Sequence, residues 1–163
     1  MICTPDDFRA AMRGLASGVS LVTTRDAAGT PHGMAATAVV SVSAEPPRLL
    51  VCVNRTASMH APLLASGLFA VSFLAVEQAG FVTLFSSPEA RSRRFDDPGW
   101  ETLVTGAPVL GGAIAALDCR VAERFDAASH TMLLGDVVAT RTTQGPAEPL
   151  VHFDGRLRSA AAA

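Results

Sequence analysis

The residues with the clearest chemical potential lie in one stretch of the first half of the chain. Small side chains surround Thr37 and Ala38, so a flat ligand can approach the backbone there, and Thr37 adds a hydroxyl group. Ser41 and Ser43 follow on either side of Val42, at the end of an expected strand. Alternating hydroxyl and backbone groups on a strand of small residues favour a binding site for a planar molecule.

A turn between an expected strand and an expected helix carries Asn54, Arg55 and Ser58. Exposed backbone N–H groups, a guanidinium group and hydroxyl groups come together at such a turn, and this combination binds phosphate. Ordinary turn and capping residues would look the same, with Thr56 or Ser58 as the N-cap of the following helix. The turn alone therefore leaves both interpretations open.

The composition excludes several classes of function. The chain has 163 residues, 13 basic residues that are all arginine, a net charge of −2 and a hydrophobic content of 49%. The absence of lysine and tyrosine excludes Schiff-base chemistry and a tyrosine acid or nucleophile. The scattered arginines give no basic patch for nucleic acid. The hydropathy is that of one folded domain with a sizeable core, and the only asparagine of the chain is Asn54.

Three separate cysteines, Cys3, Cys52 and Cys119, lack the spacing of a zinc site or a disulfide framework. We expect them to be small hydrophobic residues in a reducing cytoplasm. The amphipathic, charged segment at residues 1–16 is not that of a secretory signal. No apolar run reaches the roughly 18 residues that cross a bilayer, so we expect a cytoplasmic protein without a membrane partner.

The hydrophobic pattern predicts a mainly β protein with peripheral helices. A helix is expected to begin at Thr4-Pro5, with Phe8, Met12 and Leu15 on one apolar face. Other helical stretches are expected at residues 57–65 and at residues 76–95, the latter interrupted at Ser86-Ser87-Pro88. Strands are expected at residues 19–24, 31–43, 48–53, 68–74, 113–126, 131–142 and 150–153. Hairpins outnumber regular βαβ units, which favours an antiparallel Greek-key barrel. A single domain is expected over residues 1–158, followed by a frayed tail at residues 159–163.

Several short motifs, in their order and spacing, resemble the flavin reductase family, which has the FMN-binding split-barrel fold. Its members are the short-chain reductase partners of two-component flavin monooxygenases. The motifs are Gly33-Met34, Thr37-Ala38, Ser41-Val42-Ser43, Pro46-Pro47, Cys52-Val53-Asn54-Arg55 with Ser58, residues 69–74, Gln78, Arg94-Phe95, Trp100, residues 106–110, residues 130–137, and residues 149–153 with Gly155. The resemblance covers residues 8–158.

The resemblance implies roles for the residues in these motifs. The isoalloxazine and ribityl side of a flavin would be lined by Thr37, Ala38, Ser41, Val42 and Ser43. The ribityl chain and phosphate would be held by Asn54, Arg55 and Ser58. The only asparagine of the chain is thereby expected to contact the ligand.

Three more residues receive weaker assignments from the resemblance. Arg94 is a candidate contact for phosphate or adenine, although a solvated charge in a run of arginines is the favoured interpretation. His130 is expected to help bind NAD(P)H, although without the resemblance an ordinary surface or core histidine is favoured. The family often has Gly-Asp directly before this histidine, where Ala128-Ser129 stand here. Phe153 would lie near the flavin or the pyridine nucleotide, or else pack in the core.

The implied activity is that of an NAD(P)H:flavin oxidoreductase, in which hydride passes from nicotinamide C4 to flavin N5. One domain without a GxGxxG motif requires FMN or FAD and NADH or NADPH to share one cleft. The resemblance requires no catalytic acid or base, and it implies a homodimer that releases reduced flavin to a monooxygenase. A non-catalytic flavin- or haem-binding split-barrel protein is the main alternative. A pyridoxamine-phosphate-oxidase-like enzyme would need more basic phosphate ligands.

Overall fold

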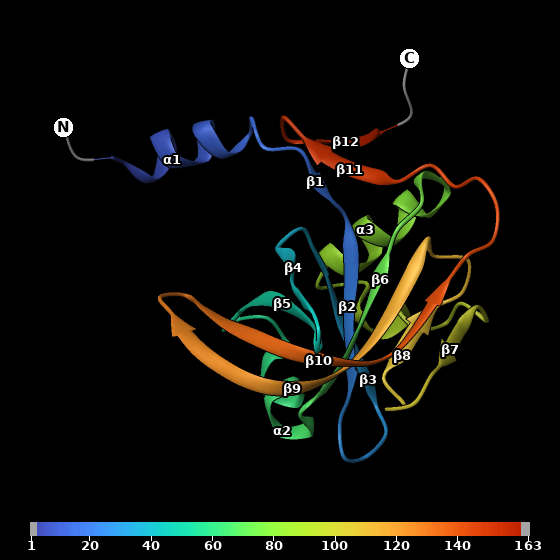
Figure 1. Ribbon diagram of the computed structural model, residues 1–163. Coiled ribbons are helices and arrows are strands. Elements are labelled where there is room, and N and C mark those ends of the chain that lie inside the picture. The colour runs from blue at the N-terminus through green and yellow to red at the C-terminus, as the bar shows by residue number, and fades with distance from the viewer. Residues whose placement is uncertain (1–2, 161–163) are drawn as a thin grey trace.

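The structure is a computed structural model that describes residues 3–160. Its centre is a seven-stranded antiparallel sheet in the order β3-β2-β6-β9-β10-β5-β4 (Figure 1). The strands are β2 (Ser20–Arg25), β3 (Pro31–Ala36), β4 (Val39–Ala44), β5 (Pro47–Asn54), β6 (Leu68–Phe73), β9 (Ala115–Ala127) and β10 (His130–Thr142). A smaller sheet joins β1 (Ser17–Gly18), β11 (Leu150–Phe153) and β12 (Arg156–Ser159).

The sheet curls because its two edge strands are consecutive in the chain. β3 and β4 lie at opposite edges of seven strands, which in a flat sheet would be about 29 Å apart. Only Thr37 and Ala38 connect them, and the three Cα steps from Ala36 to Val39 span at most about 11 Å. The sheet must therefore bend round until its edges meet at Thr37-Ala38. This is the split barrel expected from the resemblance, and the fold prediction is confirmed.

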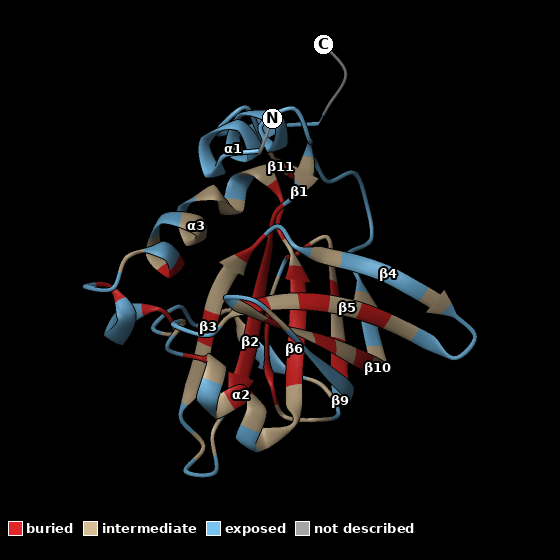
Figure 2. Ribbon diagram, turned by 90° about the vertical axis from the view of Figure 1, so that its left-hand side faces the viewer, coloured by how far each residue is buried: buried red, intermediate tan, exposed pale blue. Residues whose placement is uncertain are grey.

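The core lies on the inner face of the curled sheet. Alternate residues of β5 point inward, so Leu49, Val51 and Val53 are buried while the residues between them are partly exposed. Phe69 of β6 and Val22 of β2 belong to the same cluster and have no exposed surface. Figure 2 shows this buried band running through the middle of β2, β5 and β6. Packing of the inner face fixes which face of each strand is left for binding.

Helix α1 (Pro5–Met12) begins as expected at Thr4, with a capping box between the Thr4 and Asp7 side chains. It projects from the barrel and buries none of its residues (Figures 1 and 2). Its expected apolar face is exposed, with Phe8 at 59% and Met12 at 45% of their full accessible surface. A hydrogen bond from Asp154 N to Arg13 O, 3.1 Å long, joins the end of this segment to the β11–β12 turn.

The remaining elements pack around the barrel. They are α2 (His60–Ser66), η1 (Val76–Gln78), α3 (Ala79–Ser86), η2 (Arg91–Arg93) and the hairpin of β7 (Trp100–Thr102) and β8 (Pro108–Leu110). Helices α2 and α3 contribute to different hydrophobic clusters. Phe81, Phe85, Phe95 and Trp100 form one aromatic cluster, in which the Phe95 and Trp100 ring centroids are 4.8 Å apart. This cluster fastens α3 and the β7–β8 hairpin to the barrel.

Two expectations about individual elements are wrong. The single strand expected at residues 31–43 is broken at Thr37-Ala38, where the chain crosses from one sheet edge to the other. The helical stretch expected at residues 76–95 is interrupted where the sequence indicates, because α3 ends at Ser86; η1 precedes α3 and η2 follows it. The expected tail begins too early, because β12 includes Ser159 and Ala160 N donates to Pro149 O. Residues 161–163 of that tail lie outside the described residues.

Candidate functional site

A groove of about 910 Å³ opens at one end of the barrel. Four residues predicted from the sequence line it: Thr37, Ala38, Ser41 and Ser43. They lie at the crossing between the sheet edges and along the edge strand β4. The rest of the wall comes from Met12 at the end of α1 and the segment that follows it, the starts of β2 and β5, the last part of β6, and parts of β9, β10 and β11. Folding therefore brings distant segments around the small-residue run.

Most of the groove wall is apolar. Phe73, Leu117, Val137 and Leu150 contribute side chains from four different strands. Among the described residues that line it, Arg48 alone carries a formal charge. An apolar groove with a few hydroxyl groups and one cation suits a large planar ligand that carries polar edges.

Asn54 and His130 lie side by side beyond the groove, because they are directly paired between β5 and β10. The Asn54 Oδ1 atom accepts hydrogen bonds from Thr56 N and Thr56 Oγ1, both 2.9 Å long. A backbone N–H only donates, so the side-chain oxygen must face the turn and the NH₂ group points elsewhere. Asn54 thus shapes the turn with one atom and keeps two donors for a ligand. His130 Nδ1 lies 2.9 Å from Ser129 Oγ, which leaves Nε2 for another partner.

The rest of the predicted phosphate-binding turn is exposed. Arg55 N donates to Ser129 O at 3.0 Å, and Arg55 Nη2 lies 2.8 Å from Asp126 Oδ1. The Asp126 side chain is 84% exposed, so this ion pair is weak and does not prevent Arg55 from binding an anion. Ser58 is also exposed, and Met59 occupies the N-cap position of α2 without a side-chain hydrogen bond. The alternative in which Thr56 or Ser58 caps that helix is therefore wrong.

The groove adjoins the turn at the end of β5. Ala38 O accepts a hydrogen bond of 3.1 Å from Cys52 N, so the edge crossing lies beside the last residues of β5. Asn54 is two residues further along the strand, a distance of about 7 Å. Of the eight residues assigned to the flavin by the resemblance, seven lie in the groove or at this turn: Thr37, Ala38, Ser41, Ser43, Asn54, Arg55 and Ser58.

Sequence reasoning missed two residues of this region. His60 begins α2, and its Nε2 lies 2.9 Å from Oγ1 of Thr131, the residue after His130. Arg48 was not singled out either, although a lone arginine at the start of an apolar strand was a visible signal. The His60–Thr131 contact and the position of Arg48 in the groove both depend on segments far apart in the sequence, so spacing within the chain did not indicate them.

Arg94 belongs to the framework instead of the groove. It is only 6% exposed, and its guanidinium group donates to Gly33 O at 2.9 Å, Ser87 O at 2.9 Å and Leu84 O at 3.3 Å. Burial lowers the pKa of this guanidinium from its ordinary value. These contacts correct both expectations, phosphate contact and solvated charge, because the guanidinium group is occupied by backbone carbonyls and shielded from water.

Two other predicted residues do not line the groove. Val42 lies at the irregularity between Ser41 and Ser43 and is 52% exposed. Phe153, at the end of β11, is 42% exposed and pairs with Arg156, so the alternative of core packing is wrong. Contact of either side chain with a flavin stays a prediction.

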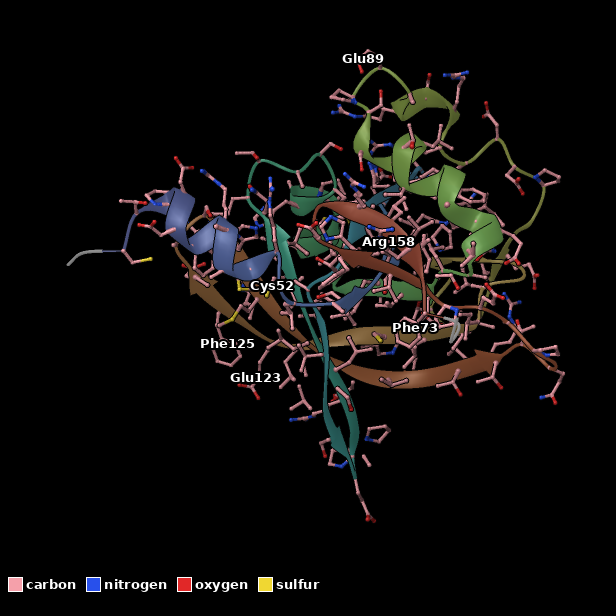
Figure 3. All side chains as sticks on the ribbon, turned by 90° about the horizontal axis from the view of Figure 1, so that it is seen from above. Cys52, Phe73, Glu89, Glu123, Phe125 and Arg158 are labelled. Atoms are coloured by element: carbon pink, nitrogen blue, oxygen red, sulfur yellow. The ribbon has the colours of Figure 1, made fainter. Side chains whose placement is uncertain are left out.

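The outer face of β5, β10 and β9 carries a partly exposed apolar patch next to the turn. Strand pairing places Cys52 beside Met132, and Met132 beside Phe125, in one row across the three strands. The next row joins Leu50 and Leu134. Figure 3 shows Cys52 and Phe125 on the same side of the molecule as α1. Burial raises the pKa of the Cys52 thiol, so the patch offers no thiolate at neutral pH.

The family model for the flavin reductase like domain matches residues 12–161 of this chain. The chain belongs to this family. Flavin reductases are also found among both the similar sequences and the similar structures. The FMN reductase (NADH) RutF of Pseudomonas syringae pv. syringae is 43% identical over 149 residues, which are 91% of this chain and 83% of that protein.

Two solved structures of enzymes that act on flavins have a similar fold. The NADH:FAD oxidoreductase SgcE6 of Streptomyces globisporus C-1027, in complex with NAD and FAD fragments, has a TM-score of 0.87 and 32% identity, with 99% of this chain and 97% of that chain covered. The styrene monooxygenase flavin reductase SMOB of Pseudomonas putida S12 has a TM-score of 0.86 and 29% identity, with 96% and 99% covered. The family expected from the motifs is confirmed. Within residues 3–160, no helix is long and apolar enough to cross a membrane.

Proposed function

We propose that this protein is an NADH-dependent flavin reductase that reduces FMN or FAD and releases the reduced flavin to a partner monooxygenase. The observation that carries the proposal is that the groove adjoins the Asn54 turn. An apolar wall with hydroxyl groups suits an isoalloxazine ring, and a turn with free donors suits its phosphate chain. The flavin is a substrate here, because it binds, is reduced and leaves.

The residues of the surface hold the flavin in sections. The ring system lies along Thr37, Ala38, Ser41 and Ser43, where small side chains let it approach the backbone. Backbone amides and hydroxyl groups of this run are within reach of the polar edge of the ring. The NH₂ group of Asn54, which faces away from its own turn, donates to the ribityl chain or phosphate. No residue of the chain has to exchange a proton for this binding.

The nicotinamide shares the cleft and is oriented by His130. Hydride leaves C4 of NADH with its bonding electron pair and forms the N5–H bond of the flavin, so NAD⁺ and reduced flavin are the products. The protein contributes proximity, because both rings are held in one groove. His130 Nδ1 is the ring nitrogen in contact with Ser129, so Nε2 would be the atom that binds the carboxamide or phosphates of NADH.

The relatives support particular substrates. The RutF relative is named an FMN reductase using NADH, and the SgcE6 structure contains NAD and FAD fragments. NADH is therefore the favoured reductant, while FMN and FAD both remain substrates to test. The SMOB relative is the flavin reductase of a monooxygenase, which supports an oxygenase as the acceptor of the reduced flavin.

We further propose that the protein is a homodimer. The apolar face of α1 and the patch around Cys52 and Phe125 are both exposed in a single copy, with Phe125 at 44% and Phe8 at 59%. A helix that buries none of its own residues gains stability by packing against a second chain. Light scattering at micromolar concentration should give twice the monomer mass, and a monomer would contradict this part of the proposal.

The free cysteines support a cytoplasmic location. All three cysteines lie within the described residues and none forms a disulfide, which fits a reducing compartment.

The absorbance of NADH tests the activity. Purified protein is mixed with FMN or FAD and either NADH or NADPH, and the loss of the reduced-nicotinamide band is followed. We expect turnover with NADH and at least one flavin, and a slower rate with NADPH. A yellow protein that oxidises neither nucleotide would favour the non-catalytic flavin carrier instead.

A further inference from the structure

Arg48 brings a positive charge to an otherwise uncharged groove. Among the described residues lining the groove it is the single residue with a formal charge. It is paired in register with Ser43, one of the residues predicted to line the flavin. About a third of its side chain is exposed, at 32%, so a ligand in the groove can approach it.

The charge of Arg48 is shared with two carboxylates. Its Nε atom donates to Asp136 Oδ1 at 2.7 Å, and Nη1 lies 4.0 Å from Glu123 Oε1. Asp136 is also the strand partner of Arg48 across β5 and β10, so the backbone pairing fixes the first ion pair. The guanidinium group has five N–H donors, and these two contacts do not occupy all of them.

Reduction changes the charge that the groove must accommodate. Hydride transfer adds two electrons and one proton to a neutral isoalloxazine ring, which leaves a negative charge at N1 and the C2 oxygen unless water supplies a second proton. In an apolar groove, an uncompensated charge is unfavourable, whereas a fixed cation stabilises it without reorganisation. The charge develops only in the product and in the transition state that leads to it.

We propose that Arg48 stabilises the negative charge of the reduced flavin. The proposal rests on the proposed function, and it assigns Arg48 to the product and transition state rather than to general flavin binding. The pairing with Asp136 and Glu123 limits this stabilisation, because part of the positive charge is already neutralised. A moderate preference for the reduced flavin lowers the barrier to hydride transfer and still lets the product leave.

The test compares the affinity for the two redox states of FMN under anaerobic conditions. Oxidised and photoreduced FMN are each titrated into wild-type protein and into Arg48→Gln, Arg48→Lys and Asp136→Asn variants. Arg141→Gln is the matched control, because Arg141 is also about a third exposed and also pairs with a carboxylate, Glu101, but does not line the groove. Melting temperatures establish that each variant is folded.

We expect Arg48→Gln to weaken binding of reduced FMN by about tenfold, the size of a hydrogen bond to a charged group, and binding of oxidised FMN by less than about twofold. Arg48→Lys should retain most of the preference, Asp136→Asn should strengthen binding of reduced FMN, and the control should change neither. Equal weakening of both redox states, or no weakening, would overturn the proposal. Failure of wild type to oxidise NADH would instead contradict the proposed function, and the two affinities would still test Arg48.

Discussion

Asn54 makes separable contributions to the turn and to the ligand, and two substitutions distinguish them. Asn54→Asp keeps the oxygen that accepts hydrogen bonds from Thr56 N and Thr56 Oγ1, and it replaces the NH₂ donor with a second oxygen. Asn54→Ala removes both the acceptor and the donor. Thr56→Ala is the control, because it removes one bond of the turn and leaves the Asn54 amide intact.

The structure gives the expected magnitudes. Asn54→Ala removes two hydrogen bonds at an exposed turn, a loss of about 1 kcal/mol in the free energy of unfolding, or about 2–4 °C in Tm. Asn54→Asp should preserve stability to within about 0.5 kcal/mol, since its carboxylate still accepts from Thr56. It loses a donor to the charged phosphate chain, which is worth about 1.5–3 kcal/mol and raises the flavin KM by about 10–100-fold.

Steady-state NADH oxidation at varied FMN concentration measures the flavin KM, and thermal unfolding measures the stability. The flavin KM should rise more than kcat falls in both Asn54 variants, because the lost contact exists before hydride transfer. Thr56→Ala should leave the flavin KM within about twofold of wild type. If Asn54→Asp has a wild-type KM, Asn54 does not bind the flavin and serves the turn alone.

Three further predictions concern other parts of the chain. His130→Ala should raise the KM for NADH about five- to tenfold with little change in the flavin KM, and an unchanged NADH KM would return His130 to an ordinary surface role. Gly135→Ala should lower the free energy of unfolding by about 1–3 kcal/mol, because its methyl group would lie 2.7 Å from Cε1 of the fully buried Phe69; an unchanged melting temperature would refute this packing. In the native protein at pH 8, a thiol reagent should modify exposed Cys3 rapidly and Cys119 only on unfolding. The reason is that Cys119 is buried, which raises the pKa of its thiol to about 12. Rapid modification of Cys119 would contradict its burial.

Local sequence signals predicted the elements that local forces determine. Thr4, Pro5 and Asp7 mark the start of α1 because Thr4 Oγ1 accepts from Asp7 N, Asp7 accepts from Thr4 N, and Pro5 has no N–H group to satisfy. The expected strands at residues 113–126 and 131–142 agree with β9 and β10 to within two residues, because long alternating runs specify strands well. The family resemblance then supplied the barrel, which element order alone only favoured.

Contacts between distant segments could not be predicted from the pattern. Residues 31–43 look like one strand, and the break at Thr37-Ala38 follows from closure of the whole sheet. β12 was missed because Arg156–Ser159 is exposed throughout and shows no hydrophobic alternation. Arg94 lies in a run of charged residues, yet burial against three carbonyls gives it a structural role. In each case the deciding partner is far away in the chain.

For the candidate site too, local motifs indicated single residues, whereas their arrangement depends on contacts between distant segments. The motifs indicated Thr37, Ser41 and Asn54 individually, but only strand pairing places Asn54 beside His130 and shows that the turn adjoins the groove. Arg48 stands out only in the three-dimensional structure, because it is the single charged residue among the described residues that line the groove.

An anaerobic stoichiometry measurement distinguishes a reductase that releases reduced flavin from a protein that retains it. The protein, in catalytic amount, is mixed with NADH and a measured quantity of FMN without oxygen, and both absorbance bands are followed. The mixture is then passed through a membrane that retains the protein. We expect that one NADH is consumed for each FMN reduced, over many turnovers, and that the reduced flavin passes the membrane. Reduction that stops at one flavin per chain and stays with the protein, or no reduction at all, would contradict it.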